Sequence, residues 1–171
     1  MMRMIKPIFS SLMLVMLMLV SSGAHAQMNI EITGVGQSLF PVAVMRFADE
    51  TQLPLRVTDV VRSDLARSGA IRNVESGNAE LTGQKVPDYK TWATRGADAL
   101  AVGDIRKLSD GRYEVMYRLY DIRKNESLGG LVVTVSADDL RLAGHKIADD
   151  IIQKILGERG VFSTRLSYVI R

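Results

Sequence analysis

The chain has 171 residues and a formal net charge of +3, and 24% of its residues are charged. It contains no cysteine, which excludes a disulfide framework and a lipid anchor attached through cysteine. Two histidines are too few for a histidine-based metal cluster, and the scattered basic residues do not favour a nucleic-acid interface.

The first 26 residues have the three parts of a secretory signal peptide. Arg3 and Lys6 give a charged start, residues 7–20 are almost wholly apolar, and Ala24 and Ala26 form an A-x-A site. The apolar run is shorter than the roughly 20 residues of a membrane span, although an uncleaved anchor is the alternative. We therefore expect cleavage after Ala26 and a periplasmic protein.

Residues 27–171 would then be the exported chain. Without Arg3 and Lys6 it has 20 basic and 19 acidic residues, so the apparent basicity belongs largely to the signal peptide. The remaining length suits one domain with its own hydrophobic core.

Two strand patterns open the exported chain. Residues 28–34 (MNIEITG) alternate between apolar and polar, which predicts a short strand. Residues 39–47 (LFPVAVMRF) are nearly all apolar, which predicts a strand buried on both faces.

Residues 53–69 predict a helix, with Pro54 in its first turn and Gly69 just past its end. Its core-facing stripe would be Val57, Val60, Val61 and Leu65. Its outer face would carry Arg56, Asp59, Arg62 and Asp64. A short strand over residues 70–74 and a loop over 75–86 follow.

The middle of the chain predicts a short helix and a meander. The helix covers residues 87–96, centred on 88–95, and Trp92 is expected to anchor it in the core. Residues 97–122 form a hairpin around Asp110-Gly111, a pair that suits a type I′ turn. A further strand over residues 128–136 completes three consecutive strands.

A long helix is predicted over residues 137–157, with Ser136 as its N-cap and Gly157 at its end. Its apolar face, which should pack on the sheet, consists of Leu140, Ala143, Gly144, Ile147, Ile151 and Ile155. Beyond it, residues 161–170 alternate as a strand, but no further strand follows with which it could pair.

The sequence offers no set of residues for catalysis, a metal or a cofactor. His145, the single histidine after residue 26, lies on the polar flank of the long helix, where a packing role is the simpler interpretation. Asp149 and Asp150 are adjacent and therefore point in different directions. The G-x-G at residues 34–36 lacks a third glycine and precedes a strand, which disfavours a dinucleotide site.

Several motifs resemble those of the TolB family, the periplasmic component of the Tol–Pal system. The most specific is Thr164-Arg165-Leu166-Ser167-Tyr168-Val169, preceded by Gly160-Val161-Phe162 and by the helix motifs Ala143-Gly144-His145 and Ile147-Ala148-Asp149. Residues 28–34 leading into 40–47, residues 92–103 and residues 113–122 are also similar to the family's N-terminal domain.

The resemblance implies an α/β domain over residues 27–160: a mixed, about five-stranded sheet with two main helices. Residues 161–171 would be the first strand of a β-propeller that is absent here. The resemblance also implies a non-catalytic role in outer-membrane integrity, cell division and bacteriocin import. Pal, which binds the propeller in this family, would be a partner only where a propeller is present.

The partner site implied by the resemblance is the mature N-terminus, which binds the C-terminal domain of TolA. The matching positions are Gln27, Met28, Asn29, Ile30, Glu31, Ile32, Thr33 and Gly34. An alternating terminal segment can add a strand to another sheet. The same residues could instead be a permanent strand of this domain, or alternate between docked and released states.

Two other classes of protein remain open at this point. One is a periplasmic small-ligand binder or hydrolase, which would need a pocket that brings His145 together with carboxylates. The other is a regulator of cell-wall enzymes with a similar sheet-and-helix architecture.

Overall fold

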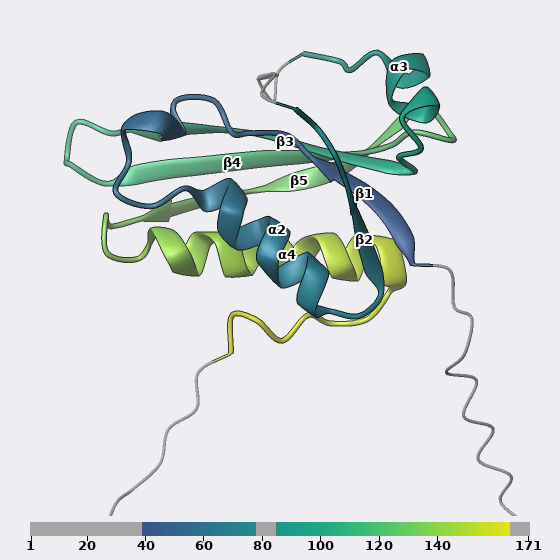
Figure 1. Ribbon diagram of the computed structural model, residues 1–171. Helices are drawn as coiled ribbons and strands as arrows, with labels where there is room; N and C mark the ends of the chain where they lie inside the picture. The colour runs from purple at the N-terminus through teal and green to yellow at the C-terminus, as the bar shows by residue number, and fades with distance from the viewer. Residues whose placement is uncertain (1–38, 78–84, 165–171) are drawn as a thin grey trace, which may run out of the picture. The chain divides into compact units, whose positions relative to one another are not determined.

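The computed structural model describes residues 39–77 and 85–164, which belong to one compact unit (Figure 1). The predicted signal peptide, the predicted strand at 28–34 and residues 165–171 lie outside the described part of the chain. None of the helices in the described ranges has the length and apolar character needed to cross a bilayer.

Five strands form one mixed sheet in the order β2-β1-β3-β4-β5. The strands are β1 (Phe40–Val44), β2 (Ile71–Val74), β3 (Ala99–Lys107), β4 (Tyr113–Asp121) and β5 (Glu126–Val135). β1 runs parallel to both of its neighbours, whereas β3, β4 and β5 are an antiparallel meander. The expected α/β fold with a mixed five-stranded sheet is confirmed.

The helices cover the two faces of the sheet unequally. α2 (Val57–Arg67) and α4 (Leu140–Leu156) lie on one face, and the short α3 (Tyr89–Thr94) lies on the other (Figure 1). β2 and β3 flank β1 on opposite sides, so right-handed crossovers place α2 and α3 on opposite faces. A 3₁₀ turn, η1 (Glu50–Gln52), precedes α2.

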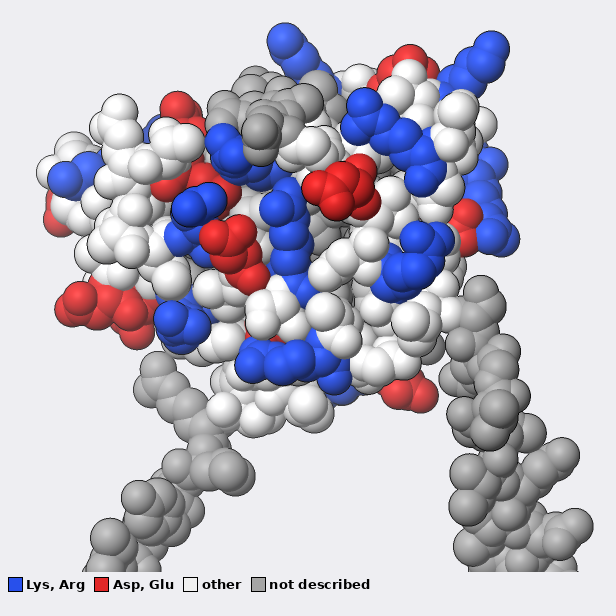
Figure 2. Space-filling model, viewed as in Figure 1, with Lys and Arg blue, Asp and Glu red and all other residues white. Residues whose placement is uncertain are grey.

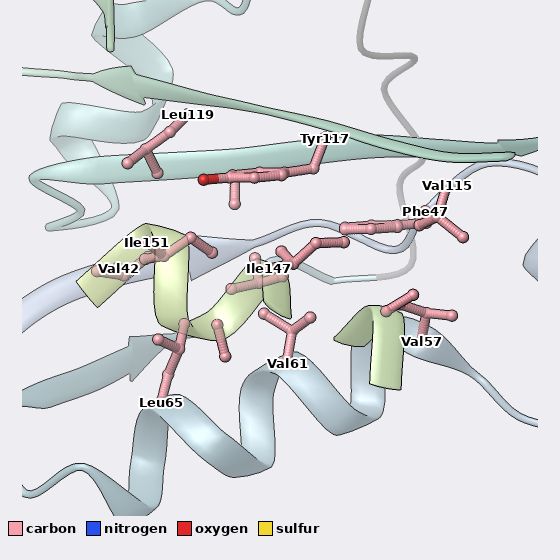
Figure 3. Packing of buried hydrophobic residues seen from close by; sticks show 14 of the residues in the cluster. Val42, Phe47, Val57, Val61, Leu65, Val115, Tyr117, Leu119, Ile147 and Ile151 are labelled. Carbon is pink, nitrogen blue, oxygen red and sulfur yellow. The ribbon is translucent and has the colours of Figure 1, made fainter. Parts of the chain in front are cut away.

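The main core lies between the sheet and the pair α2 and α4. Side chains of β4, among them Tyr117 and Leu119, point toward Ile147 and Ile151 of α4 (Figure 3). The predicted stripes of both helices are buried, apart from the half-buried Ile155. Burying each large aliphatic side chain contributes about 1.5–3 kcal/mol, so these stripes hold the helices on the sheet.

A smaller core lies under α3. Trp92 is buried there against residues of β1, β3 and β4, which confirms its predicted role as an anchor. The Asp88 side chain caps α3 by accepting hydrogen bonds from the backbone N–H groups of Lys90 and Thr91. The predicted short helix is therefore confirmed, with its boundaries drawn inward.

α2 begins four residues later than the sequence predicts. Pro54 precedes the helix instead of lying in its first turn, because η1 and an irregular stretch occupy residues 50–56. The predicted outer position of Asp64 is also wrong: its side chain is fully buried. It lies between α2 and α4, where polar partners compensate for the loss of water.

α4 also begins later than predicted, at Leu140. Ser136 starts a tight turn instead of capping the helix, and its hydroxyl donates to the Asp139 carboxylate at 2.8 Å. At the other end, Gly157 has φ of 76° and its N–H bonds to the Gln153 carbonyl, as expected for a glycine that ends a helix.

The hairpin between β3 and β4 is confirmed, but its turn is not type I′. A type I′ turn needs positive φ at both central residues, and of Asp110 and Gly111 only Gly111, with φ of 85°, has it. The Gly111 N–H donates to the Leu108 carbonyl and the Leu108 N–H to the Arg112 carbonyl. This is the three-residue loop that ends in a glycine bulge.

β5 contains a bulge that the sequence analysis missed. The register with β4 shifts between Leu119 and Tyr120, where Gly129 has φ of 83°. A Cβ on the neighbouring Gly130 would overlap with the Tyr117 carbonyl. The adjacent glycines at 129 and 130 were the signal for this bulge.

Candidate functional site

The residues predicted to bind a partner, 27–34 together with the cleavage position after Ala26, lie outside the described part of the chain. The structure describes the chain from Leu39, one residue before β1. The predicted site is therefore followed, five residues after Gly34, by an exposed leucine and then by a strand of the sheet.

That strand, β1, is an interior strand of the sheet. β1 pairs with β2 on one side and β3 on the other, and Val42 and Ala43 are fully buried on opposite faces. The predicted partner segment thus precedes an interior strand and not an edge strand.

Residues 158–164 follow α4, and we call them the C-terminal strap. The Asp149 carboxylate on α4 accepts hydrogen bonds from the backbone N–H groups of Phe162 and Ser163, both at 2.8 Å. Residues 161–164 form a turn, so the predicted final strand does not begin at Val161.

Two further residues hold the strap against α4. Gly160 lies so close to Asp149 that a Cβ at this position would overlap with the Asp149 side chain and backbone. The Phe162 ring packs against the main core. Two motifs that are separate in the sequence therefore meet in one contact: Gly160-Val161-Phe162 and the helix motif that ends in Asp149.

His145 pairs with a carboxylate, but in a packing contact between helices. Its Nδ1 lies 2.6 Å from Oδ2 of Asp64 on α2, and Arg67 donates to the other oxygen of that carboxylate. Among the described residues, no hydroxyl hydrogen-bonds to the imidazole, so a nucleophile–base pair is not formed there. The predicted packing role of His145 agrees with this geometry, although Asp64 was not foreseen as its partner.

Asp149 and Asp150 accept hydrogen bonds from different neighbours. This agrees with the prediction that adjacent residues on the helix point in different directions. Whereas Asp149 holds the strap, Asp150 accepts hydrogen bonds from the Tyr117 hydroxyl and from Lys154 Nζ, the latter at 2.8 Å. Burial, followed by the bond to Asp150, raises the pKa of Tyr117 far above its usual value. Tyr117 therefore stays protonated and ties β4 to α4.

Three of the shallow hollows on the described part of the domain bear on whether His145 lines a pocket. One, of about 290 Å³, is at the carboxyl ends of β1 and β2 around Arg62. Another, of about 400 Å³, lies between Leu53 and the start of β4, and a third, of about 240 Å³, lies beside the strap. His145 lines none of these three, and the described ranges contain no cluster of side chains suited to a metal ion.

Comparisons with known proteins agree with the motifs. A family model, the TolB amino-terminal domain, matches residues 28–128. The crystal structure of TolB from Acinetobacter baumannii is 29% identical, with a TM-score of 0.62 over 74% of this chain. The match covers 30% of that protein, so this chain spans under a third of its length.

Two more distant solved structures match this chain at lower similarity. A PelC dodecamer from Paraburkholderia phytofirmans is 17% identical over 68% of this chain and 87% of that one, with a TM-score of 0.43. The hypothetical protein CT253 from Chlamydia trachomatis is 13% identical over 70% and 97%, with a TM-score of 0.43. At this distance neither bears on function.

Proposed function

Because this chain belongs to the TolB amino-terminal domain family, we propose that it is a non-catalytic interaction module of the Tol–Pal envelope system. The match of the family model over residues 28–128, together with the structural similarity to TolB from Acinetobacter baumannii, carries the proposal. The chain would act in the periplasm after removal of residues 1–26.

In this proposal the exported N-terminus, residues 27–34, binds the C-terminal domain of TolA. An alternating segment can pair with the edge of another sheet, where backbone hydrogen bonds give affinity and alternate side chains give specificity. Ile30 and Ile32 would face the partner's core, and Glu31 would face solvent.

The module would link TolA at the inner membrane to the outer-membrane Pal system. Through this link it would support outer-membrane integrity, the inward movement of the outer membrane at division, and the entry of bacteriocins. Binding of Pal would require a propeller in addition to this domain.

A titration with the purified TolA C-terminal domain tests the partner. Deletion of residues 27–34 should abolish binding and leave the thermal midpoint unchanged, because the described core begins at β1. Ile30→Pro, which removes one backbone donor, should weaken binding, whereas Glu31→Gln should not. Equal affinity of the deletion variant and the intact protein would refute this assignment.

Export is tested separately. N-terminal sequencing of the protein from a periplasmic fraction should begin at Gln27. Recovery of the intact Met1 terminus in the membrane fraction would favour an uncleaved anchor instead.

A further inference from the structure

Arg62, on α2, has hydrogen-bond partners that the proposed function does not explain. Its Nε and Nη2 donate to the Val44 carbonyl, at 3.1 and 2.6 Å, and Nη2 also donates to the Ser76 hydroxyl at 2.7 Å. These bonds use the donors on one side of the guanidinium. The two N–H groups of Nη1 take no part in them.

The charge of Arg62 has only neutral partners. Both acceptors, the Val44 carbonyl and the Ser76 hydroxyl, are uncharged, and within the described ranges no carboxylate forms an ion pair with Arg62. By contrast, Arg67 and Arg106 each pair with a carboxylate. A half-buried guanidinium without an anion is electrostatically unsatisfied, so an anion beside it would be favoured.

The guanidinium of Arg62 is preorganised by the hydrogen bonds around it. The buried Ser76 hydroxyl accepts from Arg62 and itself donates to the Val44 carbonyl at 2.9 Å, which closes a three-membered network. The Asn73 side chain also donates to the Arg62 carbonyl at 2.9 Å and ties β2 to α2. A ligand would therefore cause little loss of side-chain freedom on binding.

A hollow of about 290 Å³ opens at this network. It is lined by Val44, Arg62, Asn73, Val74, Glu75, Ser76 and Gly77, and lies at the carboxyl ends of the parallel strands β1 and β2. Figure 2 shows basic and acidic side chains interspersed over the face viewed, without a broad patch of one sign.

We propose that this hollow binds a carboxylate group through Arg62. The hollow is lined by one positive and one negative side chain, Arg62 and the exposed Glu75, so its net charge is too small to offset the larger desolvation cost of a doubly charged phosphate. The ligand class is thus a small monocarboxylate. The inference does not depend on the partner proposed for residues 27–34.

Titration of the purified protein with sodium acetate, against sodium chloride at equal ionic strength, tests the site. The probes are the NMR signals of the Arg62 Nε–H and of the backbone N–H groups of Asn73, Ser76 and Gly77. Acetate should cause saturable shifts that chloride does not reproduce, and phosphate should bind more weakly. Identical, unsaturated shifts with both salts would overturn the proposal.

Two variants provide the matched comparison. Arg62→Gln should weaken acetate binding by about tenfold or more, since one charge-assisted hydrogen bond is lost. Arg72→Gln, which removes an equal charge from the exposed face of β2 outside the hollow, should leave binding unchanged. Unchanged affinity in Arg62→Gln would also overturn the proposal.

The fold should survive Arg62→Gln because the Ser76 hydroxyl still donates to the Val44 carbonyl. If this variant nevertheless unfolds, Glu75→Gln is a second test. Removing the rim carboxylate should tighten phosphate binding more than acetate binding. If Glu75→Gln changes the affinities for phosphate and acetate equally, Glu75 does not select between the two anions.

Discussion

His145 on α4 and Asp64 on α2 join the two helices that cover the sheet, with 2.6 Å between Nδ1 and Oδ2. The Asp64 side chain is 0% exposed, whereas that of His145 is 22% exposed. The contact therefore matters chiefly for Asp64, which would otherwise be a buried carboxylate with Arg67 as its only ion-pair partner in the described ranges.

Replacing His145 by alanine should lower the free energy of unfolding by about 1–3 kcal/mol, since a buried acceptor loses a partner. Urea unfolding of His145→Ala measures the loss. Asp59→Asn, on the exposed side of the same α2, is the control and should change stability by less than about 0.5 kcal/mol. Equal effects of the two changes would contradict a specific role for the pair.

Asp149→Asn should release the C-terminal strap without unfolding the domain. The amide keeps one acceptor oxygen, but it cannot hold both N–H groups with two carboxylate oxygens. Hydrogen exchange at Phe162 and Ser163 should become about tenfold faster or more. Glu158→Gln, an exposed change within the strap, should leave those rates as they were.

Gly160→Ala tests the same contact from the other side. The added Cβ would overlap with Asp149, so the strap must move away from α4. The expected result is faster exchange at Phe162 together with greater exposure of the Phe162 ring to solvent. A crystal structure of the variant with the strap unmoved would refute this argument.

Gly144 sets how closely α4 approaches α2. A Cβ at this position would lie 2.8 Å from Cβ and Cγ1 of Val60, so Gly144→Ala should cost about 1–3 kcal/mol through overpacking. The double variant with Val60→Ala should recover part of the loss, because it removes the side chain that clashes. Urea unfolding of the unmodified protein, the two single variants and the double variant measures this. If the losses from Gly144→Ala and Val60→Ala simply add in the double variant, the two residues do not clash.

Glu50 should make stability depend on pH. Its buried carboxylate accepts the Thr58 N–H at 3.0 Å in the first turn of α2, and burial raises its pKa above the usual 4.5, although this bond partly opposes the rise. The folded protein therefore holds the proton more tightly than the unfolded one. The stability that protonated Glu50 contributes is fully present below pH 4.5, and it is lost as the pH rises through the pKa of Glu50 in the folded protein.

Glu50→Gln keeps an acceptor for Thr58 and removes the charge. Relative to the unmodified protein, it should gain stability as the pH rises from about 4 to about 7. Urea unfolding across this range measures the difference. The exposed change Glu126→Gln is the control, and a difference for Glu50→Gln that does not vary with pH would be contrary evidence.

Apolar periodicity predicted the fold well because burial dominates the choice of elements. The stripe of α2 from Val57 to Leu65 and that of α4 from Leu140 to Ile151 are buried as expected, and so is Trp92. The sheet order was not available from these patterns, and the family resemblance implied only a mixed, about five-stranded sheet; the order came from the structure.

Polar positions were predicted less well because their environment depends on residues distant in sequence. Asp64 is flanked by polar and apolar neighbours and is separated from His145 by 81 positions, so nothing local marks it as buried. Asp110-Gly111 suits two hairpin turns, and the hydrogen bond between Leu108 and Arg112, which selects one of them, depends on strand register. The proposed partner segment, residues 27–34, rests on the resemblance alone.

The position of β1 has a mechanical consequence. A force applied to the chain before Phe40, along the axis of β1, would meet the ladders with β2 and β3 at the same time. The interstrand hydrogen bonds would then be loaded in shear and would have to fail together, instead of opening one after another as at a peeled edge. A pull on the amino end would therefore load two ladders at once.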